Sequence, residues 1–297
     1  MRKKHIEFII GGIFVVFTVF VISLIYVNAT KIDYPWYFDP LNILENRKHG
    51  KKNEIGIAII DSGFNNACQK YLRNKVIQYD VTEEDNTFDS TGHGTNMALL
   101  MGANSETKGS IYGINPYIQI YSIKVSNSLG FTNSTYLHKA LDFCKSLNIS
   151  IINIGLGGVT HNKAIENDIN ELKKKNIFVV CASGDKKTNF LYPADYASSY
   201  CVVSQNSDST IFTDSNLLST IGKKPIIVPG TEIDVLTFGL KKHDIYLTKR
   251  SGSSYATAIF SGYLSLYLAK NDCNVTPATL DGLLENNLYT NGFLSIL

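Results

Sequence analysis

Six short runs rich in isoleucine and valine constrain most strongly what this chain can fold into. They are mainly continuous apolar stretches and not strict alternations of apolar and polar residues. Strands that are buried on both faces, as in parallel sheets covered by helices, have this composition. We therefore predict six buried strands, at Ile55–Ile60, Ile118–Val125, Ile149–Leu156, Ile177–Ala182, Cys201–Ser204 and Ile226–Val228.

Helical patterns lie between several of these runs. Thr135–Leu147 carries apolar residues along one face, and Ala164–Lys175 does the same with a lysine-rich last turn. Ser254–Leu268 is small and apolar on almost all sides, which predicts a helix buried at the centre. Strands that alternate with helices are joined by right-handed crossovers, so we predict an α/β fold with a mainly parallel sheet flanked by helices.

Polar and glycine-rich segments follow three of the predicted strands. Asp61–Gly63 follows the first run, Gly155–Gly158 follows Ile149–Ile154 of the third, and Ala182–Asp185 follows Ile177–Cys181 of the fourth. Functional residues of open parallel sheets collect at the carboxyl ends of the strands. One such segment is an ordinary loop, but three at one edge of a sheet predict the walls of a functional site.

Two further segments add side chains with catalytic chemistry. In Asp89–Ala98, two glycines flank His93 at the start of an apolar helix, which lets the backbone turn tightly and the imidazole face a cleft. Ser251–Ala258 opens the predicted central helix. Taken alone, Asp61 is a helix cap or a metal ligand, and a serine at a helix start is an N-cap. Their order along the chain, aspartate then histidine then serine, is more specific than any one of them.

This order and its motifs resemble the subtilisin-like serine peptidases, or subtilases. Ile57–Gly63 is similar to the aspartate motif of that family, Gly92–Thr95 to its histidine motif and Gly252–Ala256 to its nucleophile motif. Tyr192–Ala194 is similar to the segment beside the specificity pocket. The resemblance covers nearly all of residues 34–297, and it implies a subtilisin-like three-layer fold.

The resemblance also implies an acyl-transfer mechanism. Ser254 would attack a peptide carbonyl, His93 would transfer the proton, and Asp61 would orient His93 and stabilise its charged form. The nucleophile motif selects Ser254 over Ser251 and Ser253. We therefore predict a serine endopeptidase, acting on a peptide or protein substrate.

A substrate site follows from the same resemblance. An extended peptide is expected to pair with the strand end at Gly155, Leu156 and Gly157, whose glycines let another backbone approach. Leu191 stands where relatives of broad specificity often have glycine. A side chain at that position predicts a shallow pocket that favours a small residue before the scissile bond.

The oxyanion position departs from the family pattern. The resemblance assigns the oxyanion hole to Asp185 and Ser254, but relatives usually carry asparagine in place of Asp185. Loss of that donor in a subtilisin lowers kcat by about 10²–10³-fold. An ionised carboxylate would repel the oxyanion, whereas a protonated one could donate to it. We expect a slow enzyme that works fastest at mildly acidic pH; the alternative is a catalytically impaired subtilase-like module that binds a peptide or protein partner.

Composition narrows the remaining partners. The 28 Lys+Arg and 26 Asp+Glu residues give a net charge of +2, so a nucleic-acid partner is not expected. The five cysteines form no Cys-x-x-Cys pair, so a structural zinc site is not expected either. The acidic and amide residues that bind calcium in many relatives have no clear match. We therefore predict no metal, no cofactor and a monomer.

An uncharged apolar segment, Phe8–Val27, precedes the predicted domain. A helix of about 20 apolar residues crosses a bilayer, and the basic residues before it predict a cytoplasmic N-terminus and an extracytoplasmic domain. A signal peptide cleaved near Ala29 and a buried core helix remain alternatives. The predicted organisation is a cytoplasmic N-terminus, a transmembrane signal anchor, a spacer and a peptidase domain, at residues 1–5, 6–28, 29–33 and 34–297.

The short spacer has a functional consequence. Residues 29–33 leave no room for the prodomain that many subtilases carry between the export signal and the enzyme. Confinement to the cell membrane, together with slow or narrow activity, predicts a processing role and not bulk digestion. Removal of a leader peptide from an exported precursor is the role we expect by analogy.

Overall fold

The computed structural model describes residues 18–21, 23, 34–51, 53–104, 110–185, 191–212, 225–238, 245–285, 289–290 and 293–294. The chain divides into two compact units, Met1–Tyr34 with Glu106–Ser110, and Pro35–Ser105 with Ile111–Leu297. The second unit carries the sheet and the candidate site. In the first unit, residues 18–21 and 23 are helical.

The predicted membrane span has no structural test. Phe8–Val27 lies mostly outside the described residues. Within the part of the chain that the structure describes, no helix is long and apolar enough to cross a membrane. The transmembrane helix therefore stays a prediction.

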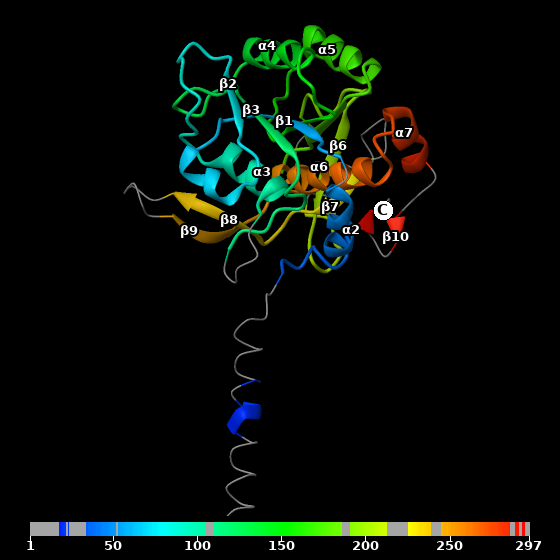
Figure 1. Cartoon of the computed structure of the whole chain (residues 1–297). Helices are drawn as coiled ribbons and strands as arrows, with labels where there is room; N and C mark the ends of the chain where they lie inside the picture. The colour runs from blue at the N-terminus through cyan, green and yellow to red at the C-terminus, as the bar shows by residue number, and fades with distance from the viewer. Residues whose placement is uncertain are drawn as a thin grey trace, which may run out of the picture. The chain divides into compact units, whose positions relative to one another are not determined.

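A seven-stranded parallel sheet forms the centre of the larger unit (Figure 1). Each of the six predicted strands overlaps one of its members. The seventh strand, β2, was not predicted because it is short and partly exposed, so it lacks a buried apolar run. In sheet order the strands are β2 (Ile77–Asp80), β3 (Gln119–Lys124), β1 (Gly56–Asp61), β4 (Ile151–Ile154), β5 (Phe178–Ala182), β6 (Tyr200–Gln205) and β7 (Ile226–Pro229).

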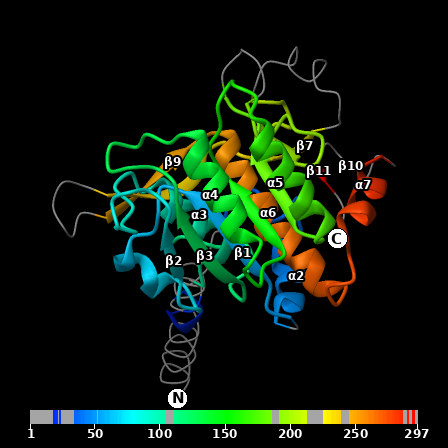
Figure 2. The same ribbon diagram turned by 90° about the horizontal axis from the view of Figure 1, so that it is seen from above.

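Helices cover both faces of this sheet (Figures 1 and 2). α4 (Ser134–Cys144) and α5 (Lys163–Lys174) lie on one face, and α3 (His93–Gly102) and α6 (Ser253–Lys270) lie on the other. The predicted α/β fold, with a mainly parallel sheet flanked by helices, is confirmed. The other described elements are α2 (Ile43–Gly50), η1 (Asn66–Tyr71), α7 (Pro277–Glu285), and the hairpins β8 (Ile233–Phe238) with β9 (Ile245–Arg250) and β10 (Tyr289–Thr290) with β11 (Phe293–Leu294).

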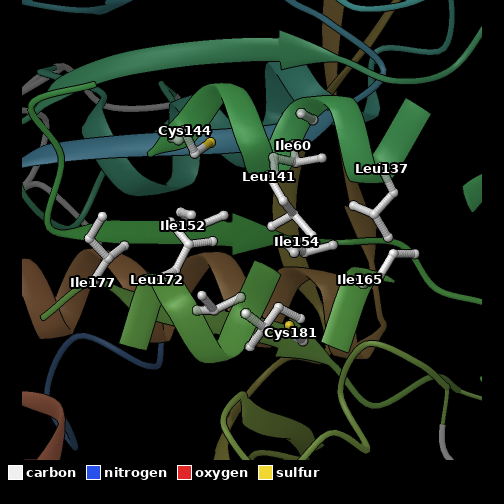
Figure 3. Close-up of a cluster of buried hydrophobic side chains, with 14 of the residues drawn as sticks. Ile60, Leu137, Leu141, Cys144, Ile152, Ile154, Ile165, Leu172, Ile177 and Cys181 are labelled. Atoms are coloured by element: carbon white, nitrogen blue, oxygen red, sulfur yellow. The ribbon is translucent and has the colours of Figure 1, made fainter. Parts of the chain in front are cut away.

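The spacing of apolar residues explains how α4 and α5 pack on the sheet. Each helix places its buried residues three or four positions apart, which forms one apolar stripe. Asparagine side chains at Asn133 and Asn162 cap the two N-termini by accepting backbone N–H bonds. Figure 3 shows the stripes meeting the sheet, at Leu137, Leu141 and Cys144 of α4, Ile165 and Leu172 of α5, and Ile60, Ile152, Ile154 and Cys181 of the strands.

The central position predicted for the last long apolar helix is confirmed in α6. Most of its residues are buried, and it contacts β4, β5, β6 and β7. Its buried hydroxyls have partners: Asn153 donates to Ser261 Oγ and Asn115 donates to Ser265 Oγ, both at 2.9 Å. Buried polar groups that are paired in this way cost little stability. The helix is slightly longer at both ends than the predicted Ser254–Leu268, since α6 begins at Ser253 and ends at Lys270.

A pair of hydrogen bonds ties α3 to the β8–β9 hairpin. Buried Asn96 donates from Nδ2 to the Leu236 carbonyl and accepts at Oδ1 from the Leu236 N–H, both at 2.9 Å. We expect Asn96→Ala to lower the free energy of unfolding by about 2–3 kcal/mol, since it leaves two buried backbone groups without these partners. Urea unfolding measures this change. The exposed control Asn271→Ala should shift it by less than about 0.5 kcal/mol, and equal losses in the two variants would contradict the expectation.

Candidate active site

Three elements deliver the predicted triad to one edge of the sheet. Asp61 is the last residue of β1, so its side chain leaves the sheet at the carboxyl end of the strand. His93 is the first residue of α3, and Ser254 lies in the first turn of α6. The carboxyl edge of a parallel sheet is where such folds gather functional residues.

The structure brings these three side chains into hydrogen-bonding contact. His93 Nδ1 lies 2.8 Å from Asp61 Oδ1 and 3.0 Å from Asp61 Oδ2. On the other side of the ring, His93 Nε2 lies 3.1 Å from Ser254 Oγ. The backbone N–H of Ser62 donates to Asp61 Oδ1 at 2.8 Å, which helps to fix the carboxylate. A hydroxyl that meets a base, which in turn meets an orienting carboxylate, is the arrangement that activates a serine nucleophile.

Two residues hold the start of α3, and with it His93, in place. Gly92 has a φ of 77° in the left-handed region, and a Cβ atom there would lie 2.6 Å from the Phe238 ring. Buried Asp89 accepts the N–H of Gly92 at 2.8 Å through Oδ1 and the N–H of Thr95 at 2.8 Å through Oδ2. This role of Asp89 was not predicted, although an aspartate just before an apolar helix is a common capping signal.

The carboxylates around His93 raise the pKa of its imidazole. Burial lowers this pKa, but the charge and hydrogen bond of Asp61 raise it, and the charges of Asp89 and Asp185 add to the rise. The net pKa lies above the ordinary value of 6.5. Because the neutral imidazole accepts the proton, activity should fall as the pH drops through this raised pKa. Protonation of His93 at low pH therefore opposes the mildly acidic optimum of activity that was expected from Asp185 alone.

Asp185, the predicted oxyanion residue, lies at the N-terminus of α6. Its Oδ1 accepts a hydrogen bond from the backbone N–H of Ser253. A Cβ atom at Gly252 would lie 2.8 Å from Asp185 Oδ2. The carboxylate is therefore beside Ser254 and turned toward the backbone that begins the helix. The Asp185 carboxylate therefore interacts with the partial positive charge at the N-terminus of α6. Without the carboxylate, the same partial charge would stabilise a developing oxyanion.

The predicted substrate edge passes directly against the triad. A Cβ atom at Gly155 would lie 2.9 Å from Asp61 Oδ2, 3.1 Å from His93 Cε1 and 3.4 Å from Ser254 Cβ. No side chain fits there without a shift, so the glycine gives another backbone room to approach the nucleophile. Leu156, the next residue, lines a different part of the surface, a cavity described below.

Leu191 fills the space between two glycine-rich segments, one that contains Gly157 and one that contains Gly184. A Cβ atom at Gly157 would lie 2.8 Å from Leu191 Cβ, and one at Gly184 would lie 2.9 Å from both Leu191 Cγ and Cδ1. The leucine side chain is thus held between the segment that follows β4 and the segment that follows β5. Gly157 and Leu191, two residues of the predicted substrate site, therefore lie next to each other.

A cavity of about 390 Å³ lies next to this edge. Leu156, Gly158 and Val159 form one side of its lining, and Tyr192 and Tyr196 form another. Backbone hydrogen bonds of 2.9 and 2.8 Å join Gly158 and Tyr192 in both directions. The two residues of this short antiparallel bridge both line the cavity.

A comparison of sequences decides the family. The sequence matches the model of the subtilase family over residues 52–295. This chain belongs to the subtilase family. Its triad geometry and its parallel sheet agree with the resemblance that the three sequence motifs gave.

Several bacterial proteases are similar to this subtilase at low sequence identity. M-protease of Shouchella clausii (strain KSM-K16) is 24% identical over 255 residues, which cover 81% of this chain and 63% of that protein. Subtilisin Savinase of Lederbergia lenta is also 24% identical, with 81% of this chain and 88% of the relative covered. Minor extracellular protease Epr of Bacillus subtilis (strain 168) is 28% identical over 86% of this chain and 38% of that protein. The chain therefore spans less than two thirds of the length of M-protease and of Epr.

Metal ligands are not gathered in the described part of this subtilase. Within those residues, no group of three or more histidine, cysteine, aspartate or glutamate side chains could hold a metal ion. That the enzyme needs neither a metal nor a cofactor stays a prediction. The triad residues offer the nucleophile, the base and the orienting carboxylate of acyl transfer to serine.

Proposed function

We propose that this subtilase is a serine endopeptidase that cleaves peptide bonds through an acyl-enzyme. The observation that carries the proposal is the unbroken chain of contacts from Asp61 through His93 to Ser254, with 2.8 Å and 3.1 Å on the two sides of the imidazole. Relatives named as proteases support the same activity. The substrate is a peptide or protein, and no nucleic acid takes part.

Each triad residue has one task in the proposed mechanism. Ser254 Oγ attacks the scissile carbonyl while His93 Nε2 takes the hydroxyl proton. Asp61 keeps the Nδ1 proton of His93 in place and stabilises the imidazolium. His93 then passes its proton to the leaving amine, and a water molecule that it activates hydrolyses the acyl-enzyme. The backbone N–H of Ser254, in the first turn of α6, would donate to the developing oxyanion.

A peptide-cleavage assay tests this proposal. The full chain in detergent should cleave members of a quenched-fluorescence peptide library, and Ser254→Ala should abolish that cleavage. Ser251→Ala is the matched control, because Ser251 Oγ bonds the N–H of Glu232 away from His93, and it should keep the activity. Equal cleavage by wild type and Ser254→Ala would contradict the proposal. No cleavage by well-folded wild type would favour the alternative, a peptide-binding module.

We further propose that Leu191 restricts the residue before the scissile bond to small side chains. The leucine contacts Gly157 and Gly184, so it occupies the space between the walls that would otherwise hold the substrate side chain. Leu191→Gly should therefore raise kcat/KM for a phenylalanine peptide relative to an alanine peptide by about 10–100-fold. Steady-state kinetics on the matched peptides measure the ratio, and an unchanged ratio would show that the pocket lies elsewhere.

We also propose that Phe8–Val27 anchors the chain in the cell membrane, with the catalytic domain on the outer side. The uncharged length of this segment and the basic residues at positions 2–5 support that orientation. The full chain should stay with membranes through an alkaline carbonate wash, and protease added outside intact cells should digest its domain. Release by the wash, with an N-terminus near Ala29, would instead identify a cleaved signal peptide.

A processing role fits an enzyme with these properties. A pocket for small residues and confinement to one surface favour a few defined cleavages, such as the removal of a leader peptide from an exported precursor. Mass spectrometry of an unfolded test protein should then find few cut sites, each after a small residue. Extensive digestion with no common residue would contradict this role.

A further inference from the structure

Two cysteines face each other across neighbouring strands of the sheet. Cys181 of β5 pairs in register with Cys201 of β6, and the two strands are parallel. Neighbouring strands lie about 4.8 Å apart, and disulfides join cysteines whose Cα atoms are about 4.4–6.8 Å apart. The backbone therefore places both residues at a separation that a disulfide can span.

Both side chains also project from the same face of the sheet. Cys181 and Cys201 belong to the buried cluster beneath α4 and α5, and they are 0% and 2% exposed. Figure 3 shows Cys181 in that cluster near Leu172 and Ile165 of α5. Neighbours in register on parallel strands point to the same side, so the two side chains leave the sheet next to each other.

We propose that Cys181 and Cys201 form a cross-strand disulfide when this protein folds outside the cytoplasm. The proposal rests on the extracytoplasmic location proposed above, because disulfides persist in such oxidising surroundings. The structure holds both side chains as thiols, the reduced form of the site. The cysteine count of five could not single out this pair, since sequence alone does not show which strands are neighbours.

The chemistry is a thiol–disulfide exchange with a small-molecule disulfide as the oxidant. The thiolate of one cysteine attacks the oxidant, which forms a mixed disulfide and releases one small thiol. The second cysteine thiolate then attacks the protein sulfur of the mixed disulfide and releases the second small thiol. Two protein thiols are oxidised to one S–S bond, and the oxidant is reduced to two thiols that take up the two protons.

Burial of the two cysteines determines when during folding the disulfide can form. An oxidant cannot reach side chains that are almost fully covered, so the bond must form before the helices close over this cluster. Once formed, the same cover shields it from reductants. The other cysteines are placed differently: Cys144 lies in α4, Cys68 in η1, and Cys273 follows α6 and is exposed.

The bond would join the strand that leads to Asp185 to its neighbour. β5 ends at Ala182, directly before the segment that carries Ser183, Gly184 and Asp185. A cross-link at Cys181 would limit how far this segment separates from β6. The disulfide would close the loop between Cys181 and Cys201. This closure should raise Tm by about 5–10 °C relative to the reduced protein.

Peptide mapping under non-reducing conditions tests the proposal. The full chain, with Ser254→Ala to prevent self-digestion, is refolded in detergent with a mixture of oxidised and reduced glutathione, denatured, alkylated and digested. We expect one linked pair of peptides that contain Cys181 and Cys201, which separate on reduction, and the higher Tm. Alkylation of both residues, or linkage of either to another cysteine, would overturn the proposal.

Two variants provide matched controls. Cys181→Ala should lose both the linked peptides and the redox-dependent shift in Tm, whereas Cys144→Ala, in the same buried cluster, should keep both. A Tm shift that survives in Cys181→Ala would also count against the pair. The readout does not depend on peptide cleavage, so failure of this proposal and failure of the proposed peptidase activity are distinguishable.

Discussion

Replacing His93 with alanine should lower kcat by about 10⁶-fold with a far smaller change in KM. The imidazole makes contacts of 2.8 Å to Asp61 and 3.1 Å to Ser254, and without it no base takes the serine proton. Steady-state hydrolysis of a peptide identified with the wild type measures the loss. His138→Ala is the matched control, since His138 bonds Asp168 between α4 and α5 and should leave kcat unchanged.

Residues that act as one unit have non-additive effects. His93→Ala combined with Ser254→Ala should therefore cost no more than either change alone. If the two losses multiplied instead, the residues would act independently, and the proposed mechanism would be wrong. Comparable losses in His138→Ala would point to general damage to the fold.

Asp185→Asn should raise kcat at neutral pH by about 10–100-fold. The carboxylate now accepts the N–H of Ser253, and asparagine could keep that bond through Oδ1. Its Nδ2 would then replace an acceptor with a donor beside Ser254, where the oxyanion develops. Peptide hydrolysis measures the gain, and the exposed Asp195→Asn is the control that should not change kcat.

The same substitution should shift the pH profile. The charge of Asp185 helps to hold the pKa of His93 above its ordinary value. Removing that charge lowers this pKa, so the acidic limb of kcat/KM should move to lower pH in Asp185→Asn. An unchanged acidic limb with no gain in kcat would mean that Asp185 does not act on the oxyanion or on His93.

Local patterns predicted much of the fold, and motifs shared with a known family selected the candidate triad. The strands buried on both faces appear in the sequence as apolar runs, and the glycines beside His93 mark the tight start of α3. The three triad residues were selected through the resemblance of their motifs to the subtilase family, and the structure places each at the end or start of an element at one edge of the sheet. Such features depend on residues close together in the chain, which is why a sequence can show them.

Contacts between distant segments were the part that the sequence could not show. The orientation of the Asp185 carboxylate toward Ser253 depends on how β5 and α6 meet. The position of Leu191 between two walls could be expected only from the family resemblance, and its contacts with Gly157 and Gly184 needed the structure. The β8–β9 hairpin was missed because β9 is mostly exposed and carries no buried apolar run.

Covalent labelling of the nucleophile is the most direct test of the central claim, that Asp61 and His93 activate Ser254. A fluorophosphonate probe reacts with a serine only when a neighbouring base has activated it. The full chain should be labelled between pH 5 and 8, and peptide mapping should place the adduct on Ser254, whereas Ser254→Ala should remain unlabelled. Absence of label on well-folded wild type across this range, or an adduct on another residue, would contradict the account.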